Sequence, residues 1–197
     1  VTEVTEVNQQ KKKVVRFTGV NTGTTTLTIT DTLTQRAQTL TVNISAPYEL
    51  NSEGKLTSWK KEAISENIVI PSTITQLINN SPFNSMRDIE KAKIKTIVAE
   101  GLTAIPTMTF MAFENLTSVT LGANVTEIGV HAFARTEKLE TFIIKATTPP
   151  TFTNPRQHAW TFSNKTTTLV VPKGAKANYE NATGWKDHFK TIEEREF

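Results

Sequence analysis

The chain has no cysteine, which excludes disulfides, zinc–thiolate sites, iron–sulfur clusters and thiol nucleophiles. Histidine and aspartate are also scarce, and they are too far apart in sequence for metal-ligand spacing or an Asp-rich calcium loop. These residues are His131, His158, His188, Asp31, Asp88 and Asp187. We therefore predict no metal site and no cofactor.

Motifs that support catalysis are missing as well. There is no Gly-x-Ser-x-Gly elbow, no phosphate-binding glycine loop and no dinucleotide fingerprint. A glycosidase needs two facing carboxylates, and each glutamate of the repeat region has an ordinary explanation as a surface residue. We predict no catalytic residues and no enzymatic activity.

Long apolar runs and strong charge are absent too. No segment approaches the roughly 18 consecutive apolar residues of a membrane span. The opening VTEVTEVNQQKKK lacks the apolar core of a signal peptide, so neither a signal nor a lipoprotein anchor is expected within this chain. The net charge is only +3, and the one basic run, Lys11 to Lys13, lies beside a predicted strand. Lysines protecting an edge strand explain that run, and no nucleic-acid partner is expected.

Threonine is abundant, at roughly one residue in six, and much of it alternates with apolar residues in the first 46 positions. This period of two predicts antiparallel strands at Val14–Phe17, Thr24–Thr30 and Thr39–Ile44. A Gly-x-x-x-Gly followed by TTTLTITD and TLTVNI resembles the last strands of a bacterial Ig-like (group 2) domain. The resemblance implies that residues 1–46 form an all-β, Ig-like sandwich or part of one.

Pro47 closes this region, and a hairpin is predicted over residues 48–59. Asn-Ser-Glu-Gly lies between two alternating stretches, with Gly54 at the position that favours positive φ. Four apolar residues of the hairpin are expected to cover the open end of the region that comes after it in the chain. They are Tyr48, Leu50, Leu56 and Trp59.

From Ile94 onward, apolar residues recur with a period of 22 to 23. One unit starts at Ile94, the next at Leu116 and a third at Leu139. In the first two units, the last two apolar positions are five apart in sequence, and the next unit starts six positions later. A looser earlier copy precedes a charged insertion at Arg87–Lys93. Its apolar positions are Ile68, Ile70, Ile74, Leu77 and Phe83. One turn cannot bury its own apolar face, so the pattern predicts stacked coils with capped ends, three to four turns in all.

The segment LTSVTLGANVTEIGVHAFARTEKLETF resembles the BspA-like leucine-rich repeats of Bacteroidetes surface proteins, whose units read LTSVTIPxxVTxIGxxAFxxCxxL. The resemblance covers about residues 48 to 192. The usual cysteine position holds Phe113 and Thr136 here. The resemblance implies that residues 47–197 form a short, capped α/β leucine-rich-repeat solenoid that is mainly β.

The last part of the chain, residues 146–197, resembles the C-terminal cap of that family. Thr148-Pro149-Pro150 is predicted to stop the regular coil. Leu169–Val171 is expected to add a last strand, and 174–181 a short helix that Gly184 ends. Tyr179, Trp185, Phe189 and Ile192 are expected to seal the core.

In an LxxVxL strand, alternate residues face outward, and stacking brings them into rows on an exposed sheet face. This face is the predicted ligand-binding surface. Its residues are Thr96, Val98, Glu100, Ser118, Thr120, Thr141, Ile143 and Lys145. An alternative is an aromatic sugar platform at Trp160 and Phe162, which would require their ring faces to be open to solvent.

Family resemblance implies a non-enzymatic cell-surface or secreted module that binds a host or neighbouring-cell protein in adhesion. A carbohydrate-binding accessory protein and a structural spacer without a ligand are the alternatives. Rows of ordinary β-formers on a solvated face would look the same in the sequence. The pattern does not name the ligand or the oligomeric state.

Overall fold

The computed structural model separates the chain into two compact units, Val1–Ala46 and Pro47–Phe197. Side chains are described in the second unit and at Ala46, and only the strands are described before that. The described residues are 2–7, 13–18, 23–30, 37–44, 46–79, 82–83, 85–154, 161–163 and 167–197.

The first unit contains two separate antiparallel strand pairs. β1 (Thr2–Val7) pairs with β2 (Lys13–Thr18), and β3 (Gly23–Thr30) pairs with β4 (Ala37–Ile44). The three predicted strands are confirmed as β2, β3 and β4, whereas β1 was not predicted. The predicted Ig-like sandwich is not supported, because the described strands form pairs rather than two facing sheets. Alternation locates a strand but does not determine its partner.

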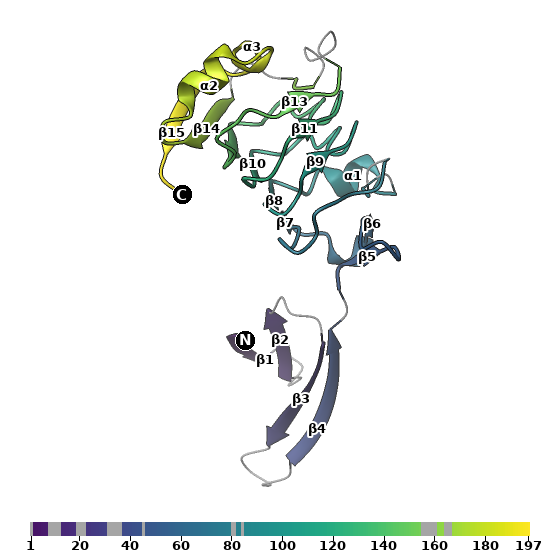
Figure 1. Cartoon of the computed structure of the whole chain (residues 1–197). Helices are drawn as coiled ribbons and strands as arrows, with labels where there is room; N and C mark the ends of the chain where they lie inside the picture. The colour runs from purple at the N-terminus through teal and green to yellow at the C-terminus, as the bar shows by residue number, and fades with distance from the viewer. Residues whose placement is uncertain are drawn as a thin grey trace. The chain divides into compact units, whose positions relative to one another are not determined.

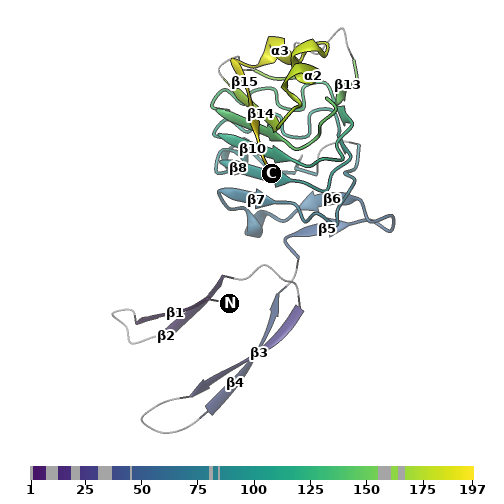
Figure 2. The same cartoon turned by 60° about the vertical axis from the view of Figure 1, so that its left-hand side comes forward.

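The second unit is a coil, with a six-stranded parallel sheet along one side (Figures 1 and 2). The spatial order is β15-β14-β12-β10-β8-β7. The strands are β7 (Asn67–Val69), β8 (Thr96–Ala99), β10 (Ser118–Leu121), β12 (Thr141–Ile144), β14 (Thr168–Pro172) and β15 (Thr191–Arg195). Burial alternates residue by residue in β8, β10 and β12, as the period-two pattern within each unit requires.

The return side of the coil is held by a short parallel sheet and a ladder of threonines. The sheet consists of β9 (Ala104–Ile105), β11 (Glu127–Ile128) and β13 (Thr151–Phe152). Thr126 donates both its backbone N–H, at 2.8 Å, and its hydroxyl, at 3.2 Å, to the carbonyl of Thr103 in the preceding coil. One coil earlier, Thr103 makes the same double contact with the Thr75 carbonyl. One coil later, Thr151 makes it with the Thr126 carbonyl. Part of the abundant threonine therefore fastens each coil to its neighbour.

A column of phenylalanines fills the interior. The ring of Phe110 lies 5.4 Å from that of Phe133, and Phe133 lies 5.3 Å from Phe162 at an interplanar angle of only 7°. Phe83 extends the column, with its centroid 5.5 Å from Phe110. The apolar positions predicted from the repeat are all buried, including those of the loose first copy.

The return side also contains residues in the left-handed region of backbone space. Met108 and His131 have φ of 59° and 57°, and Ala112 and Arg135, four residues later in each unit, have 66° and 59°. None is glycine, so each conformation has a steric cost of about 1–2 kcal/mol. The geometry directs backbone N–H groups along the coil axis: Met108 donates to Val130 at 3.0 Å. Inter-coil hydrogen bonds offset the cost.

The N-terminal end of the coil is covered by a hairpin, β5 (Tyr48–Leu50) with β6 (Leu56–Trp59), followed by the 3₁₀ turn η1 (Lys61–Ala63). Gly54 has φ of +76°, as its turn position requires. Leu56 and Trp59 are buried over the first coil, but Leu50 is 46% exposed and does not cover it. The predicted charged insertion contains a short helix, α1 (Asp88–Lys91).

The C-terminal end is closed by two short helices, α2 (Lys176–Asn181) and α3 (Trp185–His188). The Tyr179 hydroxyl donates to the Ala146 carbonyl at 2.8 Å, and the Trp185 indole donates to that of Pro150 at 2.9 Å. Two predictions were wrong here. Gly184, with φ of 83°, does not end the predicted short helix, because α2 already ends at Asn181 and Gly184 lies at the start of α3. The predicted strand at 169–171 belongs to β14, but β15 follows it and is the last strand.

Candidate functional site

The outward face of the six-stranded sheet carries a row of hydroxyl side chains. Ser118 is the register partner of both Thr96 and Thr141, so these three predicted residues lie side by side on adjacent strands. Asn67 and Thr168 extend the row, and Thr96 donates its hydroxyl to the Asn67 side-chain oxygen at 2.7 Å. The structure thus joins these predicted residues into a longer polar row than the repeat alone suggested.

A second row, two residues further along each strand, is mainly apolar. Thr120 pairs in register with Val98 and with Ile143, and all three are half-buried. At the two ends the exposure differs: Val69 is 52% exposed, whereas Val170 is only 2% exposed. The accessible part of the row therefore runs from β7 to β12.

The third predicted row reduces to one ion pair. Lys145 Nζ lies 2.8 Å from Glu100 Oε1, although the two residues follow β12 and β8 and are separated by the strand between them. Gly122 occupies the intervening position and has no side chain to block this contact. A Cβ there would lie only 1.7 Å from the Glu100 carbonyl oxygen. The pair neutralises its own charges, so the face has no net charge from its predicted residues. The lysine also lies 5.5 Å from the centroid of the Phe197 ring.

The predicted aromatic platform is not assembled by the described residues. Trp160 lies outside them. Phe162 is only 7% exposed, and one of its faces stacks on Phe133. Its ring also has a centroid 5.1 Å from that of His188. An open ring face at Phe162 is thus contradicted, because the ring completes the interior column.

The described side chains offer little for metal binding or proton transfer. Among them, no group of three His, Asp or Glu residues could hold a metal ion. Arg87 donates from its side chain and backbone to Glu90, which holds the pKa of that buried carboxyl below its usual range. Burial lowers the pKa of Lys91, whose ammonium lies 5.9 Å from the centroid of Phe113. Both belong to the packing of α1 rather than to the sheet face.

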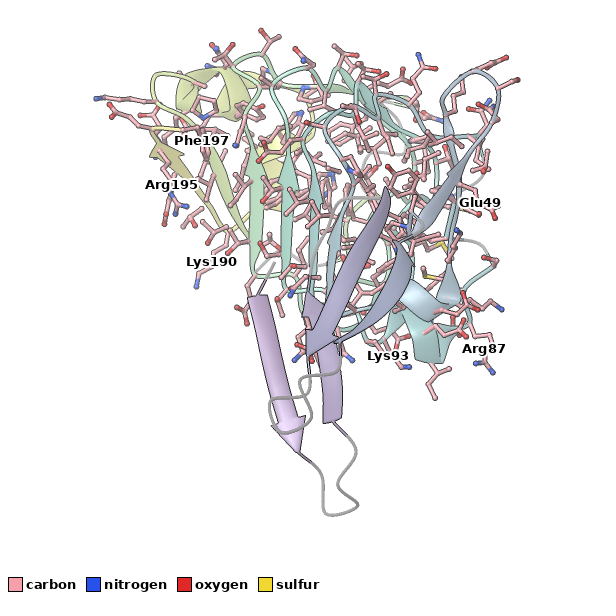
Figure 3. The ribbon with its side chains drawn as sticks, turned by 90° about the horizontal axis from the view of Figure 1, so that it is seen from below. Glu49, Arg87, Lys93, Lys190, Arg195 and Phe197 are labelled. Carbon is pink, nitrogen blue, oxygen red and sulfur yellow. The ribbon has the colours of Figure 1, made fainter. Side chains whose placement is uncertain are left out.

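Charged residues also lie on either side of the unit, away from the predicted rows. Figure 3 shows Lys190, Arg195 and Phe197 on the β15 side, and Arg87 and Lys93 on the opposite side near α1. Sequence reasoning missed the close approach at Gly122 and the edge formed by β15. The close approach at Gly122 had a signal in the sequence. This glycine directly follows LxxVxL, at the position that Glu100 and Lys145 occupy in the neighbouring units.

The profile of the BspA type leucine rich repeat region matches residues 43–164, as six copies. The chain belongs to this family. As a BspA-type leucine-rich-repeat protein it is similar to a solved leucine-rich repeat protein from Bacteroides capillosus ATCC 29799. The identity is 20%, over 65% of this chain and 96% of that chain, with a TM-score of 0.47. No curated protein matches the chain.

BspA-type repeats form protein-interaction modules, typically at the surface or secreted, and no catalytic family is indicated. The family profile begins at position 43, so it leaves nearly all of the first unit unassigned and offers no support for the Ig-like resemblance. Within the described ranges, no helix is both long enough and apolar enough to cross a bilayer.

Proposed function

We propose that this protein is an adhesion-type module of the cell surface or the secreted fraction, which binds a protein or peptide ligand through the outward face of the six-stranded sheet. The observation that carries the proposal is the half-exposed row Val98, Thr120 and Ile143, flanked by a hydroxyl row and a neutralised ion pair. Apolar groups supply burial energy, and the hydroxyls beside them offer hydrogen bonds that fix orientation.

The size of the face limits the affinity. Six strands about 4.8 Å apart and three to five residues long give a flat area of about 300 Å². A standard interface covers about 800 Å² on each partner. The face alone therefore supports a peptide or a transient contact, unless neighbouring loops contribute.

The test is a binding panel of host matrix proteins beside a glycan array. The informative variant changes Val98, Thr120 and Ile143 to Glu, which places three carboxylates along the apolar row. We expect binding of the protein ligand to be lost, or its dissociation constant to rise at least tenfold. The matched control adds the same charge off the sheet, at the exposed residues Thr107, Asn124 and Thr148.

A gentler variant protects the test against misfolding. Val98→Thr with Ile143→Thr keeps a β-branched side chain at both positions but replaces the apolar row by hydroxyls, and it should weaken binding in the same direction. Unaltered binding by both variants would show that the sheet face is not the site. Binding to glycans alone would support the carbohydrate alternative, although the burial of Phe162 counts against an aromatic platform.

A further inference from the structure

Within the ranges that the structure describes, the last strand of the sheet, β15, has a neighbouring strand on one side only. It pairs with β14 in parallel, from Thr191 to Arg195. The carbonyl of Arg195 accepts the Lys173 N–H at 3.0 Å, so Arg195 directs its backbone groups toward β14. Because backbone direction alternates along a strand, Ile192 and Glu194 direct their N–H and C=O groups outward. Among the described residues, none of these four groups has a partner.

A groove runs along this open edge. It is hollowed between β15 and the helices α2 and α3, with a volume of about 730 Å³. Phe189 and Ile192 supply apolar lining, while Lys176 and Glu180 come from α2, and Lys186 from α3. Figures 1 and 2 both show α2, α3 and β15 together at the C-terminal end of the coil. The free backbone groups of Ile192 and the apolar lining thus lie in one site, whereas Glu194 is not among the residues that line the groove.

The groove is lined by Lys176, Lys186 and Lys190 and by the acidic residues Glu180 and Glu193, so its lining carries a net charge of +1. Lys176 lies 3.8 Å from Glu180, and its backbone N–H donates to the Glu194 carboxylate at 2.9 Å. Lys186 and Lys190 are exposed, and within the part of the chain that the structure describes neither has an acidic partner. Two cations of the groove are therefore available to a carboxylate of a ligand.

We propose that this groove binds an extended acidic peptide segment as an additional strand beside β15. Outward backbone groups recur every second residue, about 6.6 Å apart, which is the repeat of an extended chain and not of a helix. A partner residue opposite Ile192 is apolar and packs against Ile192 and Phe189. Two residues away, on the same side of the strand, a carboxylate meets Lys190 and Lys186.

A second copy of the chain fits this edge less well than a single strand. Copies joined through β15 would place their edge strands about 4.8 Å apart, but each would bring α2 and α3 to the same junction. Packed helices need about 8–10 Å between their axes. A lone extended segment brings no helix, so the groove favours it.

The probe is a fluorescent peptide, acetyl-Thr-Glu-Thr-Val-Thr-Glu-Thr-amide, titrated against the full chain and followed by anisotropy. Its valine and both glutamates lie on one side of an extended strand, so a carboxylate reaches Lys190 in either direction. We expect saturable binding that weakens at least tenfold when Lys replaces both glutamates of the peptide. Lys186→Glu with Lys190→Glu should weaken it equally, whereas Lys61→Glu with Lys93→Glu, the same charge change at residues away from the groove, should not.

Two further measurements separate strand pairing from general charge attraction. The donor that faces Ile192 is the valine N–H in an antiparallel pair and the N–H of the next threonine in a parallel pair. Methylating both of these nitrogens of the probe therefore removes an edge-facing donor in either strand direction and leaves the protein untouched, so binding should fall at least tenfold. The variant with Glu at Val98, Thr120 and Ile143 should bind the peptide normally, because that row lies on the sheet face and not at its edge. Equal affinity for the methylated peptide, or for the Lys186/Lys190 variant, would overturn the proposal. So would a dimer that the peptide dissociates, because the edge would then belong to a second copy.

Discussion

Gly122 allows two coils to approach more closely than any side chain would permit. A Cβ at this position would lie 1.7 Å from the Glu100 carbonyl oxygen and 2.6 Å from its carbon, and both are backbone atoms that cannot rotate away. We expect Gly122→Ala to lower the free energy of unfolding by about 3 kcal/mol, at the upper end of overpacking costs. Chemical denaturation of the purified variant measures this loss.

Gly174 is the matched control for that substitution. It has φ of +84° and open space where a Cβ would lie, so Gly174→Ala should cost only the left-handed strain of about 1–2 kcal/mol. Equal losses in the two variants would mean that close approach is not what requires glycine at 122. The Gly122→Ala variant should also disturb the Lys145–Glu100 ion pair, which spans this position.

At the scale of the element, the C-terminal cap contains a buried hydroxyl, that of Tyr179, which donates to the Ala146 carbonyl. Burial raises the pKa of Tyr179 well above its ordinary value of 10.0. The neutral form is therefore favoured in the folded state. Its contribution to stability is complete below pH 10 and is lost as the pH rises, because the unfolded chain ionises first.

We therefore expect the free energy of unfolding to fall above pH 10 by up to about 1.4 kcal/mol per pH unit more in the parent chain than in Tyr179→Phe. Near neutral pH the variant should instead be less stable by about 1 kcal/mol, because it loses the hydrogen bond to Ala146. Denaturation curves of both proteins from pH 8 to pH 11 give the difference. If the free energies of unfolding of the two proteins changed with pH in parallel, Tyr179 would not be the group whose pKa is raised in the folded state.

The elements that the sequence predicts well are those fixed by a repeated pattern. Phe110 and Phe133, 23 residues apart, gave the interior column, and the LxxVxL strands gave β8, β10 and β12. The cap could not be predicted in the same way, because α2, α3 and β15 occur once and have no second copy to compare. Gly184 illustrates the difficulty, since a glycine with positive φ suits the end of one helix and the start of the next.

The candidate site was predictable in its rows but not in its exposure. Period-two alternation places Val98, Thr120 and Ile143 on one face. It carries no information on which residues cover each end, so the burial of Val170 and the exposure of Val69 emerge only in the folded chain. The edge groove at β15 was missed for a related reason, since it depends on helices that the repeat does not encode.

At the scale of the whole molecule, the second unit has an interior of its own. Its core cluster is made of buried residues between Leu56 and Phe189. We expect residues 47–197, produced alone, to fold and to melt within about 2 °C of the transition of the second unit in the full chain. Removing the first unit should leave the free energy of unfolding of the second unit nearly unchanged, and a small change in that free energy shifts the melting temperature little. A fragment that stays unfolded by circular dichroism would show that the first unit is required.

The threonine ladder and the parallel strands have a mechanical consequence. Their hydrogen bonds run from coil to coil, along the axis of the solenoid. A force that pulls the two ends of the second unit apart loads these junctions in series, so each bears the full tension and the weakest separates first. The junctions of β7 with β8 and of β12 with β14 each join only three residue pairs, against four between β8 and β10 and four between β10 and β12. Under tension the second unit would therefore lengthen in steps, starting at a three-pair junction, while the coils that carry β8, β10 and β12 still hold together.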